Sequence, residues 1–299
     1  SIRWLNGGLA QRKTWSQLIL RPNVRTMVGT EWGVVDYSLA LQADLHIPLW
    51  QGAQLATTAT APLSDSHSYR EGGRFEGSAH EGGLQNLLLQ QLFKPHPRVV
   101  NLTSLGLYSQ SDEPYQAIIN ESLLNLDRNY HQVRLKLGYF NGVDIDKERE
   151  VAIGTYRYFH HPADMSMEAS YGQFWSRDRG VRLTVNRHFG DTIVQLFYKY
   201  IDGDTQDGGL AISMPLTPRR DMRPAYVQVK GADRWRYGLE TSINSPTNGN
   251  PINWGMIVEP NTPYNLYRDF TDSDRLAPEY VGRRIMRMRD AYIQWGAGD

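Results

Sequence analysis

The sequence predicts an all-β protein: a closed antiparallel transmembrane β-barrel of about 12–14 strands with a C-terminal amphipathic helix. Three observations support this prediction. Apolar and polar residues alternate over long segments, most of these segments are roughly ten to fourteen residues long, and no helical segments separate them. Strands of soluble β-proteins are usually about five or six residues long, whereas a strand that crosses an outer membrane at a tilt needs about 9–11. Segment length therefore favours the membrane barrel.

The alternation is clearest between residues 35 and 47. Every odd position in this stretch is apolar, from Val35 to Ile47, whereas Asp36, Asp44 and His46 occupy even positions. Successive side chains of a strand point to opposite faces, so the segment has one apolar and one polar face. In a membrane barrel the apolar face meets lipid and the polar face meets the lumen.

Fourteen segments are predicted as strands from their alternation or from their β-branched and aromatic content. The number falls to twelve if the short thirteenth segment and its neighbour are not in the wall. The stretch 217–224 is long for an internal turn and counts against the barrel. The predicted strands span residues 15–30, 33–47, 52–62, 84–94, 98–110, 113–126, 130–142, 148–160, 165–177, 179–189, 191–202, 207–216, 224–230 and 234–243.

The chain divides into three predicted parts. Residues 1–243 form the outer-membrane β-barrel, and residues 244–275, rich in Asn, Pro, Thr and Asp, form an extended loop. Residues 276–299 form a C-terminal helical segment, because apolar residues recur there near helical spacing with Arg between them. We expect this segment to cap or plug the barrel, or to pack on its periplasmic rim.

Composition excludes several classes of protein. No uninterrupted apolar run exceeds three residues, whereas a membrane-spanning helix needs roughly twenty. The absence of cysteine removes disulfide scaffolds, thiol catalysis and cysteine-ligated metals. The 32 basic residues are balanced by 32 acidic ones, which argues against a nucleic-acid partner.

The sequence indicates no catalytic residue, no cofactor and no metal site. The run from His80 to Gly83 begins like a zinc-protease helix but lacks the second histidine. His160 and His161 are adjacent at the end of a predicted strand, and adjacent strand residues face opposite sides. The acidic stretch 202–207 lacks the spaced Gly and the distal Glu of a calcium loop. We therefore expect a protein that is not an enzyme.

The candidate functional residues are polar side chains on the predicted lumen face. Of the 32 basic residues 26 are Arg, which pairs bidentately with carboxylates and stacks on rings. Two interpretations stay open: a ladder of ion pairs that fills a narrow barrel, or a polar conduit for a hydrophilic, acidic polymer. The candidates are Asp36, Asp44, His46, Arg134, Lys136, Glu168, Arg182, Asn186, His188, Lys199, Arg236 and Glu240.

Several segments resemble outer-membrane proteins of the YjbH/GfcD type, which are linked to exopolysaccharide and group 4 capsule operons. The most specific is the run from Gly209 to Asp221, which contains Pro-Leu-Thr-Pro-Arg-Arg-Asp. The other matching segments are Leu20-Arg21-Pro22, 29–37, 48–53, 187–191, 275–280 and 288–292.

The resemblance implies a Gram-negative outer-membrane barrel that assists secretion or assembly of an exopolysaccharide. It also implies that this chain is the C-terminal barrel half of a longer parent. The implied partners are outer-membrane lipid, the polysaccharide, the missing N-terminal half, and periplasmic or outer-membrane export components. At a predicted periplasmic turn, the family motif would stabilise the barrel base or contact a periplasmic partner through Pro215, Thr217, Pro218, Arg219, Arg220 and Asp221.

Two alternatives to this function stay open. One is a soluble all-β protein that binds carbohydrate or modifies polysaccharide, and the other is a general diffusion porin. Recovery from the soluble periplasm without detergent would favour the first. Conductance separates a porin from a specialised barrel, because a plugged lumen should conduct poorly.

Overall fold

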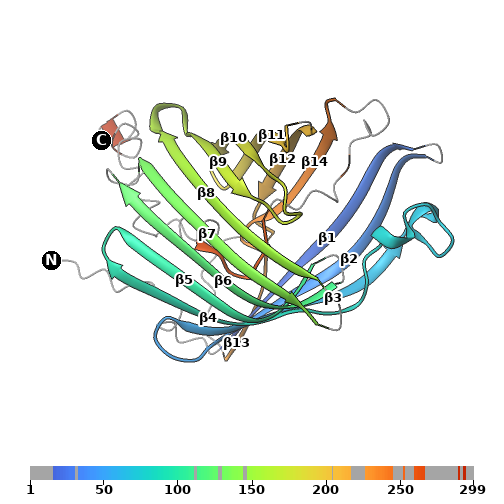
Figure 1. The fold of residues 1–299 in the computed structure, drawn as a ribbon, viewed down its shortest axis with the longest axis horizontal. Coiled ribbons are helices and arrows are strands. Elements are labelled where there is room, and N and C mark those ends of the chain that lie inside the picture. The colour runs from blue at the N-terminus through green and yellow to red at the C-terminus, as the bar shows by residue number, and fades with distance from the viewer. Residues whose placement is uncertain are drawn as a thin grey trace.

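The computed structural model describes residues 16–30, 33–110, 113–126, 130–143, 147–203, 205–216, 226–244, 252, 259–266, 289, 292 and 293. These residues form one strongly curved 14-stranded β-sheet (Figure 1). No helix in this part of the chain is long and apolar enough to cross a membrane. The predicted all-β class and the upper limit of fourteen strands are confirmed.

The observed strands follow the predicted ones closely. The largest difference is at β9, whose pairing stops before Phe174 and Trp175, and these two side chains are buried. The strands are β1 (Ser16–Thr30), β2 (Gly33–Pro48), β3 (Ala53–Asp65), β4 (Gly83–His96), β5 (Val99–Gln110), β6 (Glu113–Leu126), β7 (His131–Gly142), β8 (Glu148–His160), β9 (Met165–Gln173), β10 (Arg179–Phe189), β11 (Thr192–Ile201), β12 (Thr205–Met214), β13 (Val227–Gly231) and β14 (Trp235–Ser242).

The connections alternate between two rims. One rim, here called the loop rim, carries 66–82, 143–147, 174–178 and 202–204. It includes two short 3-10 helices, η1 (His67–Tyr69) and η2 (Glu76–Ser78), whereas a third, η4 (His161–Ala163), lies at the opposite rim. That turn rim also carries 49–52, 97–98 and 190–191. The connection between β12 and β13, residues 215–226, is long for the turn rim, as the sequence predicts.

Strands β1 to β12 form an up-and-down meander in which each strand pairs antiparallel with the next. Strand β14 pairs antiparallel with β12. It therefore runs in the same direction as β1, and the two cannot form an antiparallel ladder. Strand β13 pairs with β1 instead, in parallel, from Ser16 opposite Val227 to Leu20 opposite Gly231. The predicted fully antiparallel closure is thus wrong at this one junction.

The two ends of the sheet are consecutive in the chain, because only residues 232–234 separate β13 from β14. Ala232 touches both neighbours at the turn rim. Its N–H donates to the Leu20 carbonyl at 3.2 Å, and its carbonyl accepts from the Leu216 N–H at 2.9 Å. Backbone pairing therefore joins the two edges of the wall near this rim.

Farther from the turn rim, no ladder joins β1 and β14 directly among the described residues. Side chains connect the two strands, and the backbone of Ile252 forms an antiparallel bridge with Met27 of β1 and with Glu240 of β14. The Trp235 Nε1–H donates to the Pro22 carbonyl at 2.7 Å, and the Tyr237 hydroxyl bonds the Thr26 hydroxyl at 2.8 Å. Pro22 suits this position because it lacks the N–H that a ladder would use. We call this junction the β1/β14 seam. Closure of the wall by a continuous ladder is not observed.

The wall has an apolar outer face. Leu41, Leu105, Leu135, Leu196 and Leu210 point outward and are 38–58% exposed. Aromatic side chains lie toward both rims on this face, such as Tyr139 and Tyr171 near the loop rim and Trp50 and Phe93 near the turn rim. An apolar band between two aromatic girdles is typical of a β-wall in a bilayer.

Three sequence predictions fall mainly outside the described residues. In the predicted C-terminal segment 276–299, the structure describes only Arg289, Tyr292 and Ile293, all in helical conformation. Of the family motif, Pro215 is described and half-buried after β12. Thr217, Pro218, Arg219, Arg220 and Asp221 lie outside the described residues. Of the predicted loop 244–275, Asn244, Ile252 and residues 259–266 are described.

Two neighbouring substitutions test the assignment of faces. Leu41 is outward and lies at the middle of β2, whereas Gln42 lines the internal cavity. We expect Leu41→Arg to reduce the free energy of unfolding from vesicles by about 2–4 kcal/mol, because Arg is then held in hydrocarbon. Gln42→Arg should cost less, because lumen water and Asp44 on the same face solvate the charge. Urea titration followed by heat-modifiable gel migration measures both, and equal losses would contradict the assignment.

Candidate functional site: the polar lumen

The structure places the twelve predicted lumen residues on the inner face of the wall. Eight are buried, with 0–8% of their surface exposed, and Glu168 has a buried side chain. The remaining three, Arg182, Arg236 and Glu240, line an internal cavity. The buried eight are Asp36, Asp44, His46, Arg134, Lys136, Asn186, His188 and Lys199.

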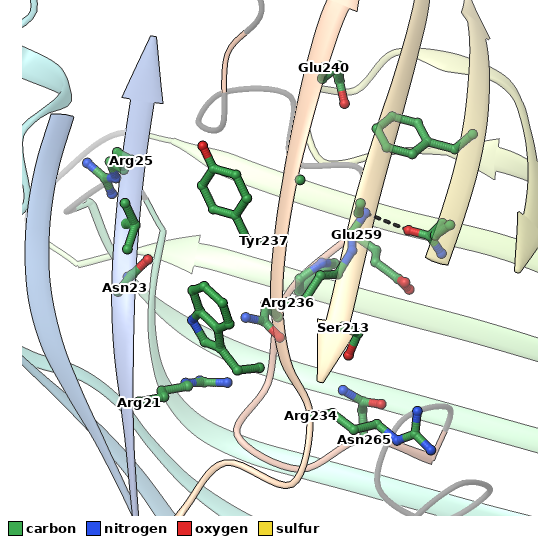
Figure 2. A pocket seen from close by; sticks show the side chains of 18 of the residues that line it. Arg21, Asn23, Arg25, Ser213, Arg234, Arg236, Tyr237, Glu240, Glu259 and Asn265 are labelled. Atoms are coloured by element: carbon green, nitrogen blue, oxygen red, sulfur yellow. Dashed lines mark hydrogen bonds between the residues drawn. The ribbon is translucent and has the colours of Figure 1, made fainter. Parts of the chain in front are cut away.

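The internal cavity has a volume of about 770 Å³ and a basic lining. Eight basic and four acidic side chains contribute to it, with histidines counted as neutral. Figure 2 shows Arg21, Arg25 and Arg236 around this space. A concave, water-accessible lining with this excess of cationic groups attracts anions and repels cations.

A continuous chain of side-chain hydrogen bonds crosses the inner wall from β6 to β14. Its central member is Glu168, which accepts from Arg157 Nε at 3.0 Å and from Asn186 Nδ2 at 2.7 Å. Each further link is between 2.6 and 3.2 Å. We call this chain the inner belt. It comprises Asn125, Gln132, Arg157, Glu168, Asn186, Gln195 and Arg236.

A fully buried lysine holds the last strand of the wall. Lys199 on β11 bonds Glu240 on β14, and its Nζ lies 3.6 Å from Asp207 Oδ2 on β12. The Lys199 side chain has no exposed surface, and Asp207 is 1% exposed. These charges depend on one another, because a buried ion left without its partner is strongly destabilising.

Phe197 on β11 provides an aromatic surface within the cavity. The guanidinium carbons of Arg182 and Arg236 lie 4.9 and 5.9 Å from its ring centroid. Glycine makes room for the ring, since a Cβ atom at Gly209 would approach a Phe197 ring carbon to 2.3 Å. Guanidinium groups beside a ring combine anion binding with stacking. The sequence signalled the arginines by strand parity but gave no signal for Phe197.

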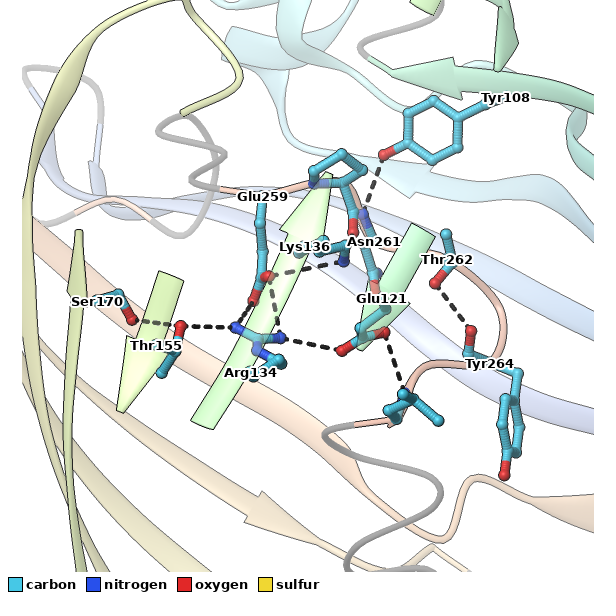
Figure 3. A network of polar contacts seen from close by, with 12 residues as sticks. Tyr108, Glu121, Arg134, Lys136, Thr155, Ser170, Glu259, Asn261, Thr262 and Tyr264 are labelled. Carbon is cyan, nitrogen blue, oxygen red and sulfur yellow. Dashed lines mark hydrogen bonds and ion pairs between the residues drawn. The ribbon is translucent and has the colours of Figure 1, made fainter. Parts of the chain in front are cut away.

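The opposite wall is covered by residues 259–266, which we call the inner segment. Arg134 binds Glu259 with two nitrogens, at 3.1 and 3.3 Å, and also contacts Glu121 at 3.3 Å (Figure 3). Lys136 Nζ donates to the Pro260 carbonyl at 2.7 Å and lies 3.6 Å from Glu259 Oε2. Two predicted lumen cations are therefore engaged by a carboxylate of the chain itself.

Further contacts fix the rest of the inner segment on the wall. The Tyr108 hydroxyl accepts from the Asn261 N–H at 3.0 Å, and Gln90 donates to the Tyr264 carbonyl at 3.0 Å. Leu266 is fully buried against Val100, Leu102 and Leu123. The inner face of β5 and β6 is therefore apolar at this point. The inner segment has no sequence periodicity, so its position could not be predicted.

An aromatic cluster occupies the lumen near the loop rim. Trp175, from the β9–β10 connection, packs edge-on against Phe140 with ring centroids 4.8 Å apart, and lies 5.8 Å from Tyr108. Tyr115 and Phe174 belong to the same buried cluster. Part of the lumen is thus filled by apolar side chains, whereas the sequence predicted a polar face toward the lumen.

His80 anchors the long connection 66–82 at the loop rim. Its Nδ1 lies 2.9 Å from the Ser38 hydroxyl, which also accepts from the His80 N–H at 3.0 Å. Arg25 donates to the carbonyls of Ser78 and Ala79 at 2.8 and 2.9 Å. Burial and the nearby Arg25 lower the pKa of His80 from 6.5 to about 4. The ring is therefore neutral at physiological pH.

No family model matches the sequence, and no curated protein matches it. Among solved structures, Pseudomonas putida OprB is similar over 80% of this chain and 90% of its own, at 11% identity and a TM-score of 0.41. The outer membrane channel DcaP of Acinetobacter baumannii covers 78% of this chain and 95% of its own, at 9% identity and a TM-score of 0.37. A loop-deletion mutant of the Vibrio cholerae outer membrane protein OmpT covers 79% and 85%, at 12% identity and a TM-score of 0.36. With values this low, function must be inferred from the chain's own residues.

Lys199→Met tests the buried charge cluster. The variant leaves Asp207 and Glu240 without their cation, so we expect a loss of about 3–5 kcal/mol in the free energy of unfolding. Combining it with Asp207→Asn and Glu240→Gln should recover most of this loss, because no buried charge then remains unpaired. Urea unfolding in detergent, followed by tryptophan fluorescence, measures both. A triple variant as unstable as the single one would show that packing, not charge, causes the effect.

The pKa of His80 predicts acid release of the connection 66–82. Since the folded pKa is below the ordinary value, the neutral ring is favoured when the connection is docked. This stabilisation is fully present above pH 6.5 and is lost as the pH falls from 6.5 to about 4. We expect amide hydrogen exchange in 66–82, corrected for its intrinsic pH dependence, to rise over this interval. In His80→Gln the rise should be absent, and an unchanged rise would assign it to other groups.

Proposed function

We propose that this chain is a Gram-negative outer-membrane β-barrel whose lumen admits hydrophilic, anionic solutes. The observation that carries the proposal is the division of the wall into an apolar outer face and an inner face with a cationic cavity. A sheet with this division is suited to lipid outside and water inside.

The cavity supports a preference for anions. Arg182 and Arg236 flank Phe197, and both line the cavity, which the inner segment also borders. An anion in this cavity meets more positive than negative side chains. Because lumen charge acts on a solute at close range, it sets ion selectivity even where surface charges are screened.

The inner segment and the aromatic cluster favour a restricted channel over a wide diffusion pore. The inner segment is held by an ion pair and several hydrogen bonds, and Trp175 fills part of the lumen near the loop rim. Both reduce the cross-section available to solutes. A general diffusion porin is the alternative, and it would have a larger conductance than a restricted channel.

A role in exopolysaccharide secretion or assembly is the finer candidate. It rests on the resemblance to YjbH/GfcD-type proteins, and the partners it implies are the polysaccharide, the N-terminal half of a longer parent and other export components. The side chains of the cavity are compatible with an acidic polysaccharide, since arginine binds carboxylates bidentately and aromatic rings pack on sugars. This role depends on the barrel function.

Recordings in planar bilayers test the anion preference. Under a salt gradient of potassium chloride, we expect a small conductance and a reversal potential of the sign given by chloride selectivity. Arg182→Gln combined with Arg236→Gln should reduce the reversal potential by roughly half, because the excess of eight basic over four acidic lining groups is halved when two arginines are lost. Arg187→Gln is the matched control. This arginine lies on the same strand as Arg182 but stacks outside on Phe189, at 5.4 Å.

The same recordings distinguish the forms of the proposal. Oligogalacturonate should reduce the current of the wild type and have less effect on the double arginine variant, whereas a neutral maltodextrin of equal length should not. Block by both sugars would support an unselective pore. Cation selectivity would contradict the proposed preference for anions, and recovery of the protein from cells in soluble form would contradict the barrel itself.

A further inference from the structure

Four uncharged polar side chains lie together on the outer face of the wall. They are Asn101 and Thr103 on β5 and Asn120 and Ser122 on β6, which we call the outer polar cluster. Strand parity places them outside, because residues that alternate with them, such as Leu102, are buried inside. Asn120 and Ser122 share their face with Ile118, which is 56% exposed.

The members of the outer polar cluster are hydrogen-bonded to one another. The Asn101 amide donates to Asn120 Oδ1 at 3.0 Å and to the Ser122 hydroxyl at 2.8 Å. The Asn120 amide donates to the Thr103 hydroxyl at 2.9 Å and to Asn101 Oδ1 at 3.2 Å. All four side chains are half-buried in this network. The cluster is therefore an ordered feature of the wall.

The cluster lies at the depth of the apolar band. Ser122 pairs with Leu135 and Asn120 with Leu137 across the β6–β7 ladder. These two leucines are 46% and 43% exposed and lie near the middle of β7, between the rims. A detergent or lipid chain that covers Leu135 would therefore also meet Ser122.

At the outer polar cluster the usual polarity of the wall is reversed: the outer face is polar and the inner face is apolar. Behind the cluster, the inner face carries Val100, Leu102 and Leu123, which pack against Leu266 of the inner segment. Polar side chains are unfavourable in hydrocarbon, and their self-association lowers this cost without removing it. Amide and hydroxyl side chains at membrane depth instead promote contact with another protein surface.

We propose that the outer polar cluster is the centre of an interface with a second copy of this chain. The chemistry of the cluster favours this partner. Each of its four side chains is both a donor and an acceptor, so the cluster is complementary to its own image about a two-fold axis. It carries no charge, so it offers no ion pair to a charged partner or to a lipid headgroup. The exposed leucines of β7, Leu135 and Leu137, extend the contact surface beyond the cluster.

Cysteine crosslinking tests the interface directly, because the chain contains no cysteine. We would introduce Ser122→Cys, reconstitute the protein in phosphatidylethanolamine–phosphatidylglycerol vesicles and add a short bismaleimide. The expected product is a covalent dimer on a denaturing gel. Leu196→Cys, on β11 and 58% exposed, is the matched control and should give little dimer. Equal yields at both positions, or no dimer at Ser122→Cys, would overturn the proposal.

A second measurement separates loss of the interface from loss of the fold. Asn101→Leu combined with Asn120→Leu replaces the amides by side chains that suit lipid, so the barrel should still assemble. We expect the dimer dissociation constant in mild detergent, measured by sedimentation equilibrium, to rise about tenfold. A wild type that is monomeric at all concentrations, or a variant that dimerises equally well, would contradict the interface. Neither result depends on the conductance of the lumen.

Discussion

The structure depends on the pairing of backbone N–H and C=O groups within the wall, because hydrocarbon offers no other partner for them. This constraint requires each strand to lie beside another along its length. It is met by a meander from β1 to β12, and the problem that remains is the closing edge. Since β14 runs in the same direction as β1, the junction combines a short parallel pair with side-chain contacts from Trp235 and Tyr237. Pro22 then occupies an edge at which a missing donor has no cost.

The lumen has features of both interpretations that the sequence left open, a ladder of ion pairs and a polar conduit. An ion-pair ladder is present, since Glu168 joins Arg157 to Asn186 in the inner belt and Lys199 joins β11, β12 and β14. A conduit is compatible with the same residues, because the belt leaves a cationic cavity beside Phe197. The inner segment divides the lumen between these roles. It pairs Glu259 with Arg134, whereas Arg182 and Arg236 face the cavity beside Phe197.

The inner segment also bears on the outer surface. Leu266 needs an apolar site on the inner face, and Val100, Leu102 and Leu123 provide it. Alternation then places their neighbours Asn101, Thr103 and Ser122 outside, and these are polar. An apolar contact within the lumen is thus coupled to a polar cluster at the membrane surface. This coupling explains why β5 and β6 alternate less clearly in sequence than β2. In β5 the apolar positions change from even to odd between Leu102 and Leu105.

The sequence by itself determined the strands and most of the lumen-facing residues, because side-chain chemistry of period two is read directly from the chain. This alternation predicted that Arg182 and Lys199 share the inner face. The lengths of the alternating segments favoured a membrane wall over a soluble sandwich. Only the tertiary structure decided the direction of the closing pair, the position of the inner segment and the face of Leu102. Register decided the last of these. A slip of one residue would exchange the two faces of β5, and the ladders to β4 and β6, not local composition, prevent that slip.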